Sequence, residues 1–197
     1  PVVYVWPETA FPGVLEEAPQ ARSMVVSAAA GASAGIIGTL RLGPDQHWRN
    51  SVVALDETGG VAAVYDKATL VPFGEYQPRF LPLQVVPGGG MTPGPGPRSW
   101  HLPGFEAAGP LVCYEVIFSG HVADHHDRPG WLVNVTNDAW YGNSAGPRQH
   151  LAAVRLRAVE EGLPVARAAN TGVSIVYDAR GHDLGRLEWG IEGVLVR

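Results

Sequence analysis

A lone cysteine raises the first question of chemistry in this chain. Cys113 is the only cysteine among 197 residues, and it ends the short apolar run 109–112. Free cysteine is among the most buried residue types, so the side chain would fill a core well. As a thiolate it would instead be a nucleophile, which requires a nearby base or cation. On the residue alone, both interpretations stay open.

The histidines offer no distinct base for this cysteine. His121 and His125 are four residues apart on a segment that we expect to be helical, but no HExxH motif surrounds them. We therefore expect a solvated helix face there rather than a metal site. A Cys–His enzyme stays possible without support, because no sequence context singles out any of the seven histidines: His47, His101, His121, His125, His126, His150 and His182.

Carboxylates and one lysine form the second set of partners. Glu8 follows the first apolar run, and Lys67, the only lysine, follows another. Taken singly, Glu8 could be an acidic residue near a helix start and Lys67 a solvated hairpin end. Both nevertheless fall, like Cys113, at the carboxyl end of a predicted strand, where open α/β sheets place functional groups. If these strands are neighbours, the three side chains share one rim. Glu75, among apolar residues and tight turns, is a fourth candidate.

The elements that must position these residues follow from short β-branched runs and helical stretches. The alternation predicts a layered α/β fold around a mixed sheet. In the helix expected over 147–161, Leu151, Val154, Ala158 and Val159 are spaced for one apolar face. The expected strands are 2–6, 35–42, 51–56, 61–65, 109–113, 131–135, 163–169, 174–177 and one or two more up to residue 197. The other expected helices are 16–30 and 118–126, and residues 57–60 form a hairpin turn.

Composition narrows the class of protein. Hydrophobic residues make up 46% and charged residues 17%, so residues 1–197 can form one domain with a real core. The net charge of −5 and the absence of any Lys/Arg cluster argue against nucleic acid as a partner. Residues 23–40 carry no charge, but their Gly and Ser content favours a helix followed by a strand over a membrane span. The Pro/Gly-rich stretch 72–97 predicts a surface loop, either a tolerated insertion or a lid.

Four sequence blocks carry a family resemblance. They are VWPETAFPG (5–13), YDKATLVPFGEYQP (65–78), LVCYEVIF (111–118) and the long block NVTNDAWYGNSAGPRQHLAAVRLRAVEEGLPVARAANTGVS (134–174). In this order they strongly resemble the apolipoprotein N-acyltransferases, a family within the carbon–nitrogen hydrolase (nitrilase) superfamily. The VPFGEY motif and the last block are specific to this family. The order Glu, Lys, Cys on its own would not identify it.

The resemblance implies a nitrilase-like αββα sandwich and acyl transfer in two steps. Cys113 resembles the nucleophile, Glu8 the general base and Lys67 the cation that stabilises the oxyanion. An acyl chain would pass from a phospholipid donor to Cys113 as a thioester, and then to the N-terminal amine of a diacylglyceryl-cysteine on an apolipoprotein acceptor. No cofactor and no metal are implied. The supporting positions that match are Glu75, Tyr114 and Glu115.

The chain also departs from that family, whose members are bacterial inner-membrane proteins with the catalytic domain on the periplasmic side, after several transmembrane helices. We therefore expect a fragment of a longer protein, which lacks the first strand and helix of the sandwich. One group of apolar loop residues would face the membrane surface or pack on the domain: Phe80, Leu81, Leu83, Val85 and Val86. The alternatives are a soluble amidase that uses the same triad with water as acceptor, and a binding domain without catalysis.

Overall fold

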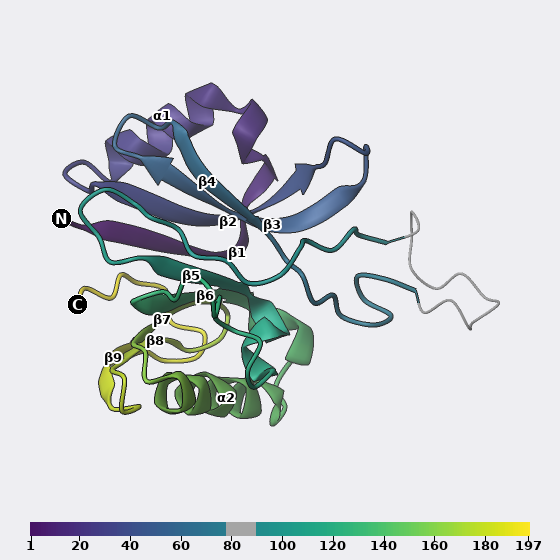
Figure 1. The fold of residues 1–197 in the computed structure, drawn as a ribbon, viewed down its shortest axis with the longest axis vertical. Helices are drawn as coiled ribbons and strands as arrows, with labels where there is room; N and C mark the ends of the chain where they lie inside the picture. Colours follow the sequence, from purple (N-terminus) through teal and green to yellow (C-terminus); the bar gives the residue numbers. More distant parts are fainter. Residues whose placement is uncertain (78–89) are drawn as a thin grey trace.

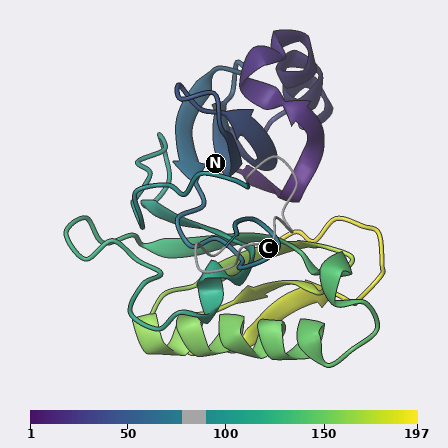
Figure 2. The same ribbon diagram turned by 90° about the vertical axis from the view of Figure 1, so that its right-hand side faces the viewer.

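Two β-sheets lie face to face between two helices in the computed structural model, which describes residues 1–77 and 90–197 (Figure 1). The first sheet has the order β1-β2-β3-β4, and the second has the order β5-β6-β7-β8-β9. Helix α1 covers the outer face of the first sheet and helix α2 that of the second, so that the layers run helix, sheet, sheet, helix (Figure 2). The αββα sandwich is confirmed.

The bounds of most strands are close to the expected ones, but the first strand, expected over 2–6, continues to Val14. The strands of the first sheet are β1 (Val3–Val14), β2 (Ala34–Leu42), β3 (Trp48–Asp56) and β4 (Val61–Asp66). Those of the second are β5 (Ala108–Val112), β6 (Trp131–Asn137), β7 (Val165–Asn170), β8 (Ser174–Tyr177) and β9 (Asp183–Leu187). The helices are α1 (Pro19–Ala28) and α2 (Gly146–Glu161), with short 3-10 turns η1 (Leu15–Glu17), η3 (Cys113–Ile117) and η4 (Asp138–Tyr141).

Alternation of side chains along the strands builds the layers. On β3, Val52 and Ala54 point into the core between the sheets, whereas Val53 and Leu55 pack toward α1. Successive side chains of a strand point to opposite faces, so one apolar run supplies two cores. On β5, Val112 joins the core between the sheets, and Leu111 packs in the core beneath α2.

Both sheets are mixed, in agreement with the sequence pattern, but there are two of them rather than one. Strand β1 pairs with β2 in parallel, and β2, β3 and β4 are antiparallel. Strands β5, β6 and β7 are parallel, and β8 and β9 continue antiparallel. The expectation that a further strand and helix belong to the sandwich stays a prediction.

The prediction of a helix over residues 118–126 is wrong, because this segment forms turns. Gly120 has a φ of +71°, and the Asp124 carboxylate accepts the backbone N–H groups of His126 and Asp127 at 2.8 and 3.2 Å. Such local bonds compete with a helix. His121 and His125 are therefore not a helical pair.

Two smaller expectations also need correction. Cys113 does not end strand β5, which stops at Val112, but opens η3. On α2, Leu151, Val154 and Ala158 pack inward, whereas Val159 is 52% exposed and lies outside the apolar face.

The uncharged stretch 23–40 forms the second half of α1 and most of β2, as expected. Within residues 1–77 and 90–197, no helix is long and apolar enough to cross a membrane. The residues predicted to form a membrane-facing arm lie outside the described residues: Phe80, Leu81, Leu83, Val85 and Val86.

A bulge in β1 is the feature of the fold that matters most for the site. Trp6 pairs with Ile37 and Phe11 pairs with Thr39, so four residues of β1 lie opposite the single residue Gly38 of β2. A Cβ atom on Gly38 would lie 2.2 Å from the carbonyl oxygen of Pro7 and 2.6 Å from the Cα of Glu8. The bulge that presents Glu8 thus depends on a glycine beside it.

We expect Gly38→Ala to lower the free energy of unfolding by about 1 to 3 kcal/mol, the usual cost of overpacking, because the new methyl group meets backbone that cannot move aside. Urea denaturation measures this change. Gly193→Ala is the matched control, because its Cβ would meet only the Leu187 side chain at 3.4 Å. Equal stability of the two variants would contradict the close approach of β1 and β2.

Candidate active site

Glu8 projects from the bulge of β1 into the space between the sheets, and it is buried. Its Oε1 accepts a hydrogen bond from Nδ2 of Asn50 at 2.6 Å. Its Oε2 accepts the backbone N–H of Asn137, at the end of β6, at 2.7 Å. The carboxylate therefore joins the first sheet to the second, and both of its oxygens are fixed.

Lys67 follows β4 and is only 1% exposed. Its Nζ lies 2.8 Å from each carboxylate oxygen of Glu75 and 4.0 Å from Oε1 of Glu8. A buried ammonium needs such partners, because an unpaired charge is costly away from water. Burial alone would lower the pKa of Lys67, but the negative charges of the Cys113 thiolate and the two carboxylates raise it.

Asn50 on β3 links the two carboxylates. Its Nδ2 donates to Glu8 at 2.6 Å and to Glu75 at 2.9 Å, so one amide fixes the geometry of both acids. Glu75 is held further by the backbone N–H of Val71 at 2.8 Å. These contacts favour the interpretation that Glu75 orients Lys67.

Cys113 lies across the intersheet space, directly after β5. It is buried, and its φ of +53° is the left-handed conformation that residues other than glycine seldom adopt. The turn places the thiol where the charges of both Glu8 and Lys67 act on it. Sequence positions 8, 67 and 113 thus meet at one place. The common-rim hypothesis is wrong for Glu8 in one respect, because this residue lies in the bulge within β1 and not at the carboxyl end of a strand.

Electrostatics keep the thiol protonated in the resting site. Burial, followed by the charge of Glu8, raises the pKa of Cys113 to about 11, although Lys67 and the Thr136 hydrogen bond lower it. At neutral pH the thiol therefore needs a base at the moment of reaction, and Glu8 is the carboxylate within hydrogen-bond reach.

Glu115 fixes the two chain segments that carry Lys67 and Cys113. Its Oε1 accepts the backbone N–H groups of Ala68 and Thr69 and the hydroxyl of Tyr65, at 2.7, 3.0 and 2.9 Å. Its Oε2 accepts the backbone N–H of Val112 at 2.7 Å. Glu115 is thus a structural anchor behind the site.

The aromatic ring of Tyr114 lies close to the ammonium group of Lys67. Nζ of Lys67 lies 5.6 Å from the centre of the Tyr114 ring, within the range of a cation–π contact. The Tyr114 hydroxyl donates to the carbonyl of Leu70 at 3.1 Å, which ties the ring to the loop after Lys67.

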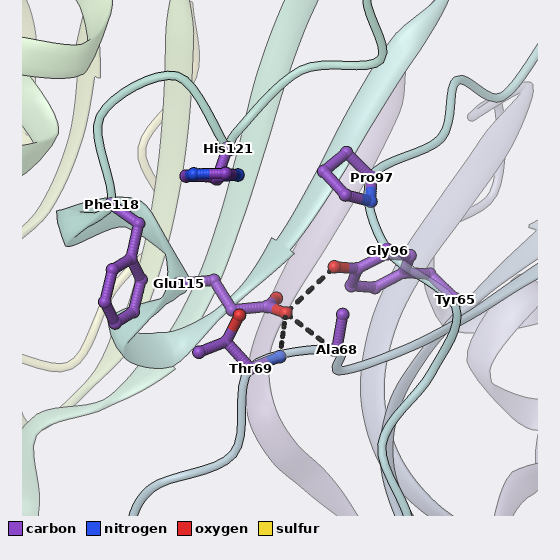
Figure 3. Close-up of a pocket in the computed structure, with 8 residues that line it drawn as sticks. All are labelled: Tyr65, Ala68, Thr69, Gly96, Pro97, Glu115, Phe118 and His121. Carbon is purple, nitrogen blue, oxygen red and sulfur yellow. Dashed lines mark hydrogen bonds between the residues drawn. The ribbon is translucent and has the colours of Figure 1, made fainter.

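A cavity of about 340 Å³ lies beside Glu115 (Figure 3). Figure 3 shows that the Glu115 carboxylate turns toward Tyr65 and the backbone at Ala68 and Thr69. Neither Cys113 nor Glu8 lines this cavity, so it is separate from the site of the triad.

Residues 2–197 match the family model described as carbon–nitrogen hydrolase. The chain belongs to the carbon–nitrogen hydrolase family. Two solved structures of similar fold agree with this assignment. An amidase from Nesterenkonia sp. has a TM-score of 0.67 at 22% identity and matches 95% of this chain and 73% of its own. A carbon–nitrogen hydrolase from Helicobacter pylori G27 has a TM-score of 0.67 at 17% identity, with 94% and 73% covered.

Among curated proteins, this carbon–nitrogen hydrolase is similar to apolipoprotein N-acyltransferases. It is 42% identical to that of Bradyrhizobium diazoefficiens over 98% of this chain, and 41% identical to that of Rhodopseudomonas palustris over 97%. In both comparisons the chain spans 38% of the relative's length.

Sequence reasoning missed several polar residues of this carbon–nitrogen hydrolase site. Asn50 and Thr136 gave no signal, because each is an ordinary residue within a strand pattern. A second group lies behind Cys113: Asn134, Asp138, His150 and Arg167. They all belong to the block 134–174, but nothing in their spacing predicts that they meet.

We expect iodoacetamide to alkylate Cys113 faster in Glu8→Gln than in the unmodified protein at pH 9. The carboxylate charge raises the pKa of the thiol, so its removal lowers that pKa and increases the thiolate fraction below pH 11. The gain is roughly tenfold for each unit by which the pKa falls. Intact-protein mass against time measures the rate, with Cys113→Ser as the unlabelled control. An unchanged rate in Glu8→Gln would show that the Glu8 charge does not act on this thiol.

Proposed function

We propose that this chain carries the catalytic site of an apolipoprotein N-acyltransferase, which moves an acyl chain from a phospholipid to the N-terminal amine of a diacylglyceryl-cysteine on an apolipoprotein. The observation that carries the choice of substrate is the identity of about 40% with curated enzymes of that name over nearly the whole chain. The convergence of Glu8, Lys67 and Cys113 supports the covalent chemistry.

In the first half-reaction, Glu8 takes the proton of the Cys113 thiol as the sulfur attacks the ester carbonyl of the phospholipid. The Lys67 ammonium stabilises the oxyanion that forms, in a site from which water is largely excluded. The carbonyl re-forms, the alkoxide of the lysophospholipid leaves with the proton from Glu8, and Cys113 carries the acyl chain as a thioester.

In the second half-reaction, the amine of the apolipoprotein attacks the thioester. Glu8 accepts a proton from the amine, the C–S bond breaks, and the proton passes to the sulfur. The amide product leaves, and the thiol is restored. Glu75 and Asn50 hold Lys67 and Glu8 in place through both steps, since their contacts do not involve the thiol.

Both substrates of this reaction are lipids in a membrane, so the proposal places the site at the periplasmic face of a bacterial inner membrane. Exposed aromatic side chains near the site support this placement. Trp140, in η4, is 84% exposed, and Phe73, two residues before Glu75, is also exposed. Aromatic residues are enriched where proteins meet the membrane interface.

We expect the full natural protein to transfer a labelled acyl chain from phospholipid vesicles to a synthetic diacylglyceryl-cysteine peptide, and Cys113→Ala to lose this activity. Glu8→Gln should lower the rate at least a hundredfold, the lower end of what a general base contributes. Mass spectrometry of the peptide measures the product.

The same samples distinguish the acyltransferase from the amidase alternative, in which water is the final acceptor of the acyl group. Ammonia release from simple amides, without acylation of the peptide, would overturn the acyltransferase assignment. Full acyl transfer by Cys113→Ala would overturn the assignment of Cys113 as the nucleophile.

A further inference from the structure

The backbone carbonyl of Cys113 accepts two side-chain hydrogen bonds. It accepts a hydrogen bond from Nδ2 of Asn134 and another from Nε2 of His150, both at 3.1 Å. Two donors on one carbonyl matter here because the residue has a left-handed φ of +53°. A strained backbone conformation persists only where the surroundings over-determine it.

A single guanidinium orients both donors. Nη1 of Arg167 donates to Oδ1 of Asn134 at 2.7 Å, which turns the amide so that its Nδ2 faces Cys113. Nη2 of Arg167 donates to Oδ2 of Asp138 at 2.6 Å, and the other oxygen of Asp138 lies 2.9 Å from Nδ1 of His150. Asp138 thereby fixes the plane of the imidazole.

The histidine ring has an oxygen acceptor at each nitrogen. Asp138 Oδ1 faces Nδ1, and the Cys113 carbonyl faces Nε2. Arg167 Nη2 also lies 3.5 Å from Nδ1. Because a carbonyl oxygen can only accept, the contact with Cys113 calls for an N–H at Nε2. The Tyr141 ring packs edge-on against the imidazole, with ring centres 5.8 Å apart.

This network is fully buried, and stability alone does not explain it. The side chains of Asp138 and Arg167 are 0% exposed, and that of His150 is 2% exposed. Apolar residues of similar volume are often as stabilising as a buried ion pair. Gly172 also leaves room for the network, because a Cβ there would lie 2.2 Å from Oδ2 of Asp138.

We propose that Asn134, Asp138, His150 and Arg167 form a positioning brace that holds the Cys113 carbonyl and so keeps the left-handed turn that aims the thiol at Glu8. His150 is a positioning residue here, since it contacts the backbone of the nucleophile and acts through it. The inference rests on the proposed function, in which Cys113 is the acylated residue.

The test compares His150→Ala and His150→Gln in the full natural protein, with acyl transfer from phospholipid vesicles to the diacylglyceryl peptide as the readout. His150→Ala leaves the carbonyl with one donor, so kcat should fall roughly 10- to 100-fold, the cost of a small misplacement of a reacting group. KM should change less than about twofold, because the brace does not bind substrate. The amide of His150→Gln can replace the Nε2 donor and should restore most of kcat.

His101→Ala is the matched control. His101 pairs with Asp127 at 2.7 Å in the same way as His150 pairs with Asp138, but both side chains are exposed, and kcat should not change. Rates are divided by the fraction of folded protein from circular dichroism, so that a merely structural loss does not count. A kcat of His150→Ala within twofold of the unmodified protein would overturn the brace.

Nuclear magnetic resonance of the unmodified ¹⁵N-labelled protein gives a second measurement, which does not depend on whether any variant folds. We expect a slowly exchanging N–H signal from Nε2 of His150, and an unprotonated Nε2 would overturn the brace. Failure of the proposed function itself is recognised separately, because the unmodified protein would then transfer no acyl chain to the peptide, whereas the resonance of His150 Nε2 would still report on the brace.

Discussion

The burial of one ammonium group determines much of this structure. Lys67 is 1% exposed, and a charge in that position is tolerated only with close partners of opposite sign. Glu75 provides two oxygens at 2.8 Å and Glu8 a third at 4.0 Å. Two carboxylates around one cation leave an excess of negative charge, and the Asn50 amide compensates it by donating to both. The same excess explains why Glu8 raises the pKa of the nearby thiol.

The two-sheet sandwich brings these charges next to Cys113, the proposed nucleophile. Glu8, Asn50 and Lys67 come from the first sheet, whereas Cys113 and Thr136 come from the second. The apolar core between the sheets excludes water beside the site, which strengthens each electrostatic interaction within it. The hydrogen bond from the Asn137 backbone to Glu8 spans the two sheets at the proposed catalytic site.

The sequence predicts most of the strands from their apolar runs, and Lys67 and Cys113 do follow strand ends. It misplaces the end of the first strand, because β1 continues through the bulge that holds Glu8 as far as Val14. It failed over residues 118–126, where Gly120 and the Asp124 turn outweigh helix propensity. The role of Asn50 could not be predicted from the sequence, because it depends on two carboxylates 42 and 25 residues away in the chain. Nothing in the sequence distinguishes His150 from the other histidines, since its contact with the Cys113 carbonyl depends on where α2 lies. Long-range geometry of this kind leaves no local pattern.

The central claim of this account is that Cys113 carries the acyl chain, and the most direct test is to trap that intermediate. The full natural protein is incubated with phospholipid vesicles in the absence of any apolipoprotein acceptor, and its intact mass is measured before and after treatment with hydroxylamine. The account predicts a mass increase of one acyl chain, located on the peptide that contains Cys113 and removed by hydroxylamine, as for a thioester. An unmodified Cys113 in a preparation that still acylates the peptide acceptor would contradict it.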